Sequence, residues 1–239
     1  MDNRYLEKAK EKILNFMKTE YKGEDIRFCS AFLFGDSKLI EKNKPLADLF
    51  NSLAIVERPN IIYIRTDTEL EINGVNIKDL TEKLHLAAFF GGDVKSIKQV
   101  KCDVIISENL SFFMSEKPNN SIFLYNKGFH LTKQISHFVE KLTFNKLVFF
   151  GDVDCQGVAI FNSFKRFFGN IEFYPDFETV KFIVEHYNLP LPKDECESED
   201  FEHLKELVEF LKEKKVRIEQ EFLQVLFYRK ELNKPRWIR

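Results

Sequence analysis

Long hydrophobic runs are missing from this 239-residue chain, and none approaches the roughly 18 apolar residues that a membrane-spanning helix needs. The opening segment, MDNRYLEKAK, is charged and lacks the apolar core of a signal peptide. The four cysteines form no Cys-x-x-Cys pair and the five histidines form no cluster, which favours reduced thiols over a disulfide framework or a zinc site. We therefore expect a cytoplasmic protein with no membrane partner.

The chain also has no excess of positive charge. Its 36 basic and 38 acidic residues give a net charge of −2, so the chain as a whole does not attract polyanions. Any contact with nucleic acid must come from local basic patches or from a partner subunit. Phenylalanine is abundant, with 26 residues, but most lie in apolar runs such as AFLF, AAFF and LVFF. This placement favours core packing over stacking on single-stranded nucleic acid.

The first hundred residues mix helical and strand patterns. The spacing of apolar residues over 4–18 predicts an amphipathic helix. Asn73-Gly74 is typical of a tight hairpin turn. The segments that we expect to be strands are IRFCSAFLF at 26–34, IIYIR at 61–65, and the two arms of the hairpin at 69–77. We treat residues 1–100 as a smaller N-terminal α+β region.

From residue 102 onward, expected strands alternate with expected helices. This alternation predicts βαβ units, a mostly parallel sheet flanked by helices, and thus an α/β fold. We treat residues 101–239 as one domain that ends in helices. The expected strands are CDVIIS, SIFLY, KLVFF and IEFY, and the expected helices are LTKQISHFVEKL, VAIFNSFKRFF, ETVKFIVEHY and two more within 200–232.

Three carboxylates follow these strands. Asp152 and Asp154 come just after the third strand, and Glu108 comes just after the first, at the sheet edge where α/β proteins bind ligands. Crowded carboxylates raise one another's pKa unless a cation lies between them, and Mg²⁺ prefers such oxygen ligands. The pattern therefore predicts a Mg²⁺ site, with Mn²⁺ as a substitute. The alternative is a turn in which Asp caps the next helix and Gly157 relieves crowding.

Several segments together resemble a known family. Glu108-Asn109 after a strand, NKGF at 126–129 and FFGDVDCQGVAIFNSFK at 149–165 resemble the Toprim domain, the metal-binding fold of topoisomerases, bacterial-type primases and OLD-type nucleases. The pattern is similar to the C-terminal domain of JetD, the nuclease subunit of the Wadjet plasmid-defence system, which is related to the A subunit of topoisomerase VI. LFGDSKLIE at 33–41 and RIEQEFL at 217–223 extend the resemblance to about residues 28–232.

The resemblance implies a Toprim-like, Rossmann-like fold in which Glu108, Asp152 and Asp154 are both the catalytic residues and the metal ligands. The sequence departs from the family in one respect: the segment before Glu108 contains no recognisable winged helix that could present a nucleophilic tyrosine. Hydrolysis is therefore expected rather than covalent strand passage. The residues that we expect to contact nucleic acid are Lys38, Lys127, Gly128, Lys165 and Arg166, and those expected to have structural roles are Gly151 and Gly157.

These expectations combine into a Mg²⁺-dependent DNA endonuclease, the effector of a multi-subunit anti-plasmid or anti-phage defence system. Its expected partners are DNA and a condensin-like ATPase complex or other subunits that select the DNA. An apolar stripe on the N-terminal helix would suit a homodimer. Two alternatives stay open: an RNA-processing Toprim nuclease, and a non-catalytic scaffold or dimerisation module.

Two later segments are less informative. Glu219 and Glu221 in RIEQE are typical of surface charge, with a supporting polar contact as the alternative. The C-terminal tail, NKPRWIR, is typical of a disordered terminus, with contact to a nucleic-acid backbone as the alternative.

Overall fold

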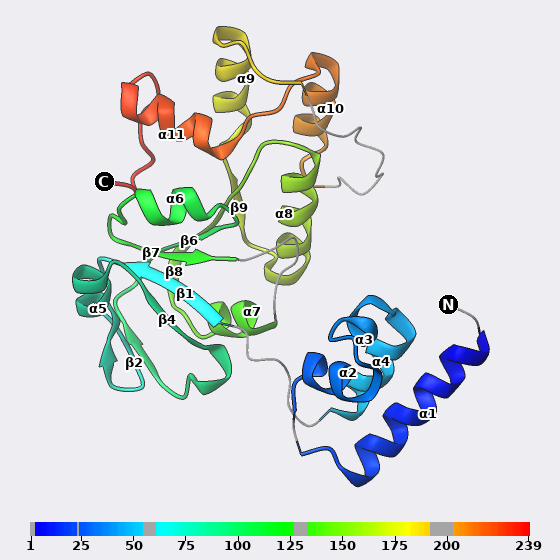
Figure 1. The fold of residues 1–239 in the computed structure, drawn as a ribbon. Coiled ribbons are helices and arrows are strands. Elements are labelled where there is room, and N and C mark those ends of the chain that lie inside the picture. Colours follow the sequence, from blue (N-terminus) through cyan, green and yellow to red (C-terminus); the bar gives the residue numbers. More distant parts are fainter. Residues whose placement is uncertain (1–2, 23, 55–60, 127–132, 192–202) are drawn as a thin grey trace. The chain divides into compact units, whose positions relative to one another are not determined.

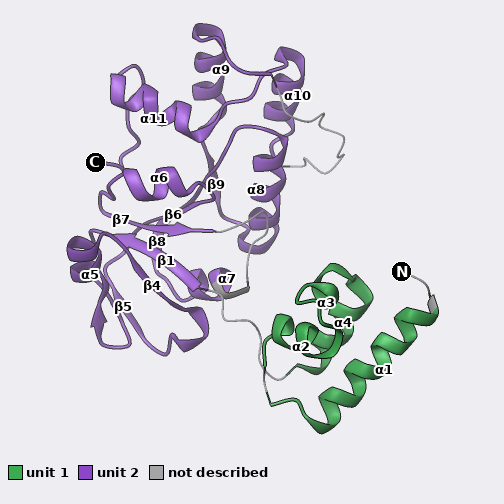
Figure 2. Cartoon of the chain, viewed as in Figure 1, with its two compact units in different colours: residues 1–59 green, residues 60–239 purple. Residues whose placement is uncertain are grey.

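The chain forms two compact units, residues 1–59 and 60–239 (Figure 2). The computed structural model describes residues 3–22, 24–54, 61–126, 133–191 and 203–239. Within these ranges every helix is too short or too polar to span a membrane. The sequence patterns placed the division after residue 100. The units divide earlier because strands that precede residue 100 pair in one sheet with strands that follow it.

The first unit is entirely helical in its described part. Apolar residues on one face of the first helix, including Ala9, Ile13 and Phe16, are buried against the other helices of this unit. This confirms the predicted amphipathic helix. Its four helices are α1 (Asn3–Thr19), α2 (Ile26–Phe34), α3 (Leu39–Lys42) and α4 (Lys44–Leu53).

The prediction of a buried strand at 26–34 was wrong, because this segment is the helix α2. Asp25 caps its start by accepting a hydrogen bond from the backbone N–H of Arg27. Gly35 ends it in the left-handed conformation, with φ 74°, and its N–H donates to the carbonyl of Ala31. The run is apolar at nearly every position, so its hydrophobic spacing does not distinguish a helix from a strand. The two cap residues are the features that favour a helix.

The second unit is built on a six-stranded sheet with the order β4-β1-β7-β6-β8-β9 (Figure 1). The pairs β6–β7, β6–β8 and β8–β9 are parallel, whereas β1 runs antiparallel to both of its neighbours. The predicted α/β fold with a mostly parallel sheet is therefore confirmed. The strands are β1 (Ile61–Thr66), β4 (Ala87–Phe90), β6 (Cys102–Ser107), β7 (Ser121–Tyr125), β8 (Phe144–Phe150) and β9 (Glu172–Tyr174).

A smaller three-stranded sheet contains the predicted hairpin. Asn73 and Gly74 form its turn with φ 50° and 83°, and positive φ at both central residues is what a type I′ hairpin turn requires. The Asn73 side chain also accepts hydrogen bonds from the backbone N–H groups of Lys95 and Ser96. These bonds join the turn to the segment that directly precedes the last strand of this sheet, at residues 97–99. The strands are β2 (Leu70–Ile72), β3 (Val75–Asn76) and β5 (Ile97–Gln99).

Helices cover both faces of the large sheet. Successive strand residues point to opposite faces, so Val104 and Ile106 pack against one layer of helices while Ile105 packs against the other. Figure 1 shows α6 and α7 on opposite sides of the sheet. The helices of this unit are α5 (Ile77–Leu84), α6 (Leu110–Ser115), α7 (Lys133–Glu140), α8 (Cys155–Phe168), α9 (Phe177–His186), α10 (Lys205–Lys214) and α11 (Gln220–Arg229).

The C-terminal tail is part of this fold, so the expectation of a disordered terminus was wrong. Trp237 is only 4 % exposed and packs among the rings of the α6 layer. Arg236 forms two hydrogen bonds to Asp103, through Nε at 3.0 Å and Nη2 at 3.2 Å. Arg239 donates to the Asp67 carboxylate at 2.7 Å. The basic side chains of the tail that make these contacts are therefore already paired with carboxylates of the same unit.

Candidate active site

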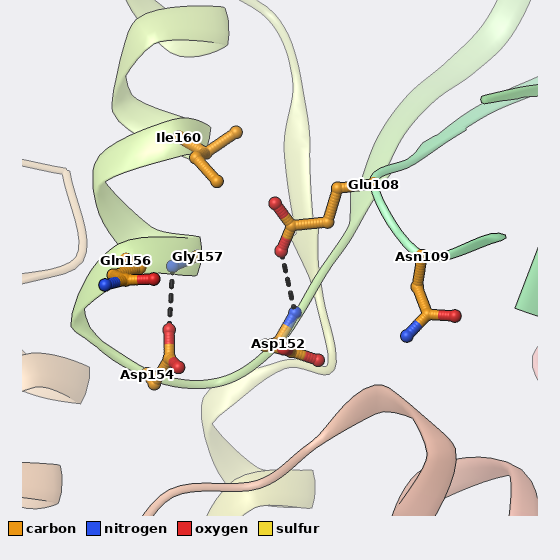
Figure 3. Close-up of a pocket in the computed structure, with 7 residues that line it drawn as sticks. All are labelled: Glu108, Asn109, Asp152, Asp154, Gln156, Gly157 and Ile160. Atoms are coloured by element: carbon orange, nitrogen blue, oxygen red, sulfur yellow. Dashed lines mark hydrogen bonds between the residues drawn. The ribbon is translucent and has the colours of Figure 1, made fainter. Parts of the chain in front are cut away.

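A pocket of about 250 Å³ lies where strands β6 and β8 end (Figure 3). The two strands are adjacent and parallel, and Ser107 at the end of one is in register with Phe150 at the end of the other. The residues that follow them therefore emerge at the same edge of the sheet. The described lining of the pocket consists of Glu108, Asn109, Asp152, Asp154, Gln156, Gly157 and Ile160.

Glu108 reaches across this edge to the loop after β8. Its Oε1 accepts a hydrogen bond from the backbone N–H of Asp152 at 3.3 Å. Gly151 leaves room for this contact, because a Cβ at that position would lie 3.0 Å from Glu108 Oε1 and 2.5 Å from the Phe149 ring. The predicted structural role of Gly151 thus has a physical basis: a side chain there would displace the glutamate from the loop.

Asp154 is the N-cap of α8. One of its carboxylate oxygens accepts from the backbone N–H of Gly157 at 2.8 Å. Gly157 is packed so closely against the loop that a Cβ would overlap the carbonyl oxygen of Asp152. The capping turn weighed as an alternative to a metal site is therefore present, and it leaves the second oxygen of Asp154 without a hydrogen bond among the described residues.

Asp152 is fixed by a different helix. Its Oδ1 accepts from the backbone N–H of Gln220, the first residue of α11, at 2.8 Å. The two aspartates are therefore held by different helices, α8 and α11, although both carboxylates line one pocket. Within the described ranges, no three His, Cys, Asp or Glu side chains form a group that could hold a metal ion.

Burial and like charge shape the electrostatics of the pocket. Burial is the main cause that raises the pKa of Glu108 from 4.5 to about 7, and the charges of Asp152 and Asp154 add to it. The pKa of Asp152 is also raised, again mainly by burial, although the N–H of Gln220 opposes the shift. The pocket therefore disfavours its own negative charge at neutral pH.

This electrostatic cost predicts how stability depends on pH. The pKa of Glu108 is higher in the folded than in the unfolded chain, so its contribution to stability is fully present below about pH 4.5 and is lost as the pH rises through about 7. In EDTA, we expect the free energy of unfolding to fall by roughly 2–3 kcal/mol over this range. Urea unfolding followed by the emission of Trp237, the only tryptophan, would measure it.

The matched control is Glu108→Gln, which removes the titrating group and should flatten this part of the pH profile. Glu178→Gln, an exposed substitution on α9, should leave the profile of the wild type unchanged. If the stability of Glu108→Gln depended on pH as that of the wild type does, Glu108 would not be the group whose raised pKa causes this dependence.

The residues at the start of α11 are part of the site, although no sequence pattern predicted this. Gln220 is fully buried, and its side chain donates to Ser107 Oγ at 3.2 Å. Ile218 pairs with Val153 through two backbone hydrogen bonds of 2.8 and 3.1 Å. Glu221 accepts from Asn109 Nδ2 at 2.8 Å, which confirms the supporting polar contact for this residue. The signal in the sequence was the segment RIEQEFL, but its partners lie 65 to 113 residues away.

The other residues expected to contact nucleic acid are not among the described residues that line the pocket. Lys165 and Arg166 are in the last turn of α8, where Lys165 Nζ donates to the carbonyl of Ile171 at 3.2 Å. That turn is about 16 Å from the capping end of the helix. Lys38 is exposed in the first unit, next to α3. Lys127 and Gly128 lie outside the described residues.

Two of the four cysteines agree with the expectation of reduced thiols. Cys29 and Cys102 are buried free thiols.

Comparison with known proteins adds one finding. The family model described as "Wadjet protein JetD, C-terminal" matches residues 57–232. The match covers every strand of the large sheet, all three carboxylates of the pocket and the helix α11. No curated protein matches the chain.

Proposed function

This chain belongs to the family of Wadjet JetD C-terminal domains, and we propose that it is a Toprim-type, Mg²⁺-dependent DNA endonuclease. Membership in the family indicates a role in defence and a multi-subunit context. The finer proposal is that the chain hydrolyses phosphodiester bonds of DNA that other subunits select, such as a condensin-like ATPase complex. The net charge of −2 supports the need for such subunits, because the chain alone lacks a strong attraction for DNA.

The observation that carries the proposal is the composition of the pocket. Glu108, Asp152 and Asp154 come from the ends of two adjacent strands, and the described lining contains carboxylates and amides but no lysine or arginine. A phosphodiester carries negative charge and would be repelled by such a lining. A divalent cation removes this repulsion, and the same cation would relieve the raised pKa of Glu108.

The residues fit Mg²⁺ by the chemistry of their donor atoms. Each carboxylate uses one oxygen to accept a backbone N–H and has a second oxygen with no hydrogen bond among the described residues. The lack of a three-residue ligand group is compatible with Mg²⁺, which is commonly held by one or two carboxylates together with water and substrate phosphates. When bound, Mg²⁺ would polarise the phosphodiester and lower the pKa of a water molecule.

Each carboxylate has a distinct proposed role. Asp152 and Asp154, which are anchored by the N-termini of α11 and α8, would hold the cation in place. Glu108 would contribute to cation binding as an anion, because a bound cation lowers its pKa from the value of about 7 that burial gives it in the metal-free pocket. Gly151 and Gly157 would keep the loop close enough to Glu108 for this arrangement.

Metal-dependent nicking of supercoiled plasmid tests the proposal. We expect the purified chain, with its genomic neighbours' products added where needed, to nick plasmid in Mg²⁺ or Mn²⁺. We expect no nicking in EDTA and recovery when the metal is restored. Absence of metal-dependent nicking even with the partners present would contradict the proposal. Cleavage of structured RNA with DNA left intact would support the RNA nuclease instead, and absence of Mg²⁺ and Mn²⁺ binding by calorimetry would support the scaffold.

A further inference from the structure

The segment that enters α11 contacts both strand ends that form the pocket. Ile218 forms a backbone bridge with Val153, between the two aspartates, and both side chains are buried. Two residues later, the backbone N–H of Gln220 donates a hydrogen bond to Asp152, and the side-chain amide of Gln220 donates one to Ser107. A residue distant in sequence thus connects the loop that carries Asp152 with the strand end next to Glu108.

The contact with Asp152 is a helix cap supplied by another part of the chain. Glu219, the N-cap of α11, makes no capping hydrogen bond with its side chain. The Asp152 carboxylate takes this place by accepting the N–H of Gln220, and the positive end of a helix favours a carboxylate there. One oxygen of Asp152 is thereby fixed, which determines the direction of the other.

The contact with Ser107 fixes the second strand end. The Gln220 side chain is 0 % exposed, and its amide nitrogen lies 3.2 Å from Ser107 Oγ. That hydroxyl also accepts the backbone N–H of Asn109 at 3.1 Å, so it orients the turn that contains Glu108. A buried polar side chain of this kind costs free energy unless its hydrogen bonds are made, so its geometry is narrowly defined.

We infer that Gln220 is a positioning residue of the metal site, which sets the spacing between Asp152 and Glu108 without contacting the metal or the substrate. The inference rests on the proposed function, because it requires that the pocket binds a divalent cation. Residues that orient metal ligands from behind typically contribute about 10-fold to 100-fold to metal affinity. A residue with only a structural role would change stability without changing that affinity.

Two substitutions separate the contacts of Gln220. Gln220→Met keeps the side-chain length and the backbone N–H but removes the hydrogen bond to Ser107. Gln220→Pro also removes the N–H that Asp152 accepts. Proline is tolerated here because position 220 is the first residue of a helix and Glu219 before it is extended, with φ −77° and ψ 144°.

The experiment measures Mn²⁺ binding to the full chain by electron paramagnetic resonance, alongside urea unfolding. We expect the Mn²⁺ dissociation constant to rise several-fold in Gln220→Met and by about 10-fold to 100-fold in Gln220→Pro. Val139→Ala, a buried substitution on α7 at the other face of the sheet, is the control for lost stability. It should unfold at lower urea concentration and bind Mn²⁺ as the wild type does.

The other outcomes show whether the role of Gln220 or the proposed function itself fails. Wild-type affinity in both Gln220 variants would overturn the inference and leave the proposed function standing. An equal loss of affinity in Val139→Ala would overturn it too, because the loss would then follow stability. A wild type that binds no Mn²⁺ would overturn both. If Gln220→Pro does not fold, Gln220→Met decides, and wild-type affinity in that variant counts against the inference.

Discussion

Replacing Asp154 by asparagine is expected to lower Mg²⁺-dependent nicking of supercoiled plasmid by about 100-fold or more while the fold stays intact. The reason is that Asp154 has two separable properties. It caps α8 through one oxygen, and asparagine caps helices about as well as aspartate. It also carries a charge into the pocket, which asparagine does not. Nicking rates at saturating metal, with circular dichroism to verify folding, would measure the difference.

The chain offers a control of the same kind at another helix. Asp176 caps α9 by accepting the N–H of Thr179 at 2.8 Å, the same length as the Asp154 cap, and it does not line the pocket. Asp176→Asn should therefore nick at the wild-type rate. Asp152→Asn and Glu108→Gln should lose activity as Asp154→Asn does. Wild-type nicking rates in the three pocket variants would contradict the proposed role of these carboxylates. An equal loss of nicking activity in Asp176→Asn would contradict it too.

Local sequence patterns were sufficient for the part of the fold that carries these residues. The strands at 102–107 and 144–150 could be predicted because each is a short apolar run between turn residues, and the helix at 155–168 because Asp154 precedes it as a cap. The position of the carboxylates after those strands follows from general properties of parallel sheets. The pocket could therefore be located from local signals alone.

The segment 26–34 shows where such patterns fail. Its residues are apolar on almost every side, so hydrophobic spacing does not separate a strand from a helix. The structure keeps it helical and leaves Phe28 and Phe32 more than half exposed, with their rings stacked on each other at 6.2 Å. The capping residues Asp25 and Gly35 were the signal that could have identified the helix.

Contacts between distant segments were beyond local patterns. Nothing near Gln220 indicates that its N–H meets a carboxylate 68 residues earlier. Likewise, no local feature of 61–66 reveals that this strand runs antiparallel between β4 and β7. Such pairings depend on how whole elements pack, so a sequence indicates which residues are polar at the site but not which of them orient the others.

The pocket combines an electrostatic cost with a partial remedy from the fold. Burial raises the pKa of both Glu108 and Asp152, so the metal-free site opposes the charges that a cation needs. Two helix N-termini reduce this cost, since α8 and α11 each direct a backbone N–H at one aspartate. The N–H of Gln220 thus limits the rise in the pKa of Asp152, whereas the pKa of Glu108 rises to about 7 with the N–H of Asp152 opposing the shift.

Trp237→Ala is expected to lower the free energy of unfolding by about 3–5 kcal/mol, as for other large buried aromatic residues. The Trp237 ring lies 5.7 Å from that of Phe150 and 5.4 Å from that of Tyr174, measured between centroids. Phe150 directly precedes the loop that carries Asp152, so the tail supports the strand end from which the pocket is built. Urea unfolding followed by circular dichroism would measure the loss, because the variant has no tryptophan left to report it.

Two further variants define what this loss means. Trp237→Phe keeps an aromatic ring in the cluster and should cost clearly less than alanine. Tyr228→Ala removes a ring that is 88 % exposed on α11 and should change stability by no more than about 0.5 kcal/mol. If Trp237→Ala were as stable as Tyr228→Ala, the tail would not be part of the folded unit. A large loss confined to Trp237→Ala would instead show that these last residues, which lie beyond the family match at 57–232, stabilise the sheet beneath the pocket.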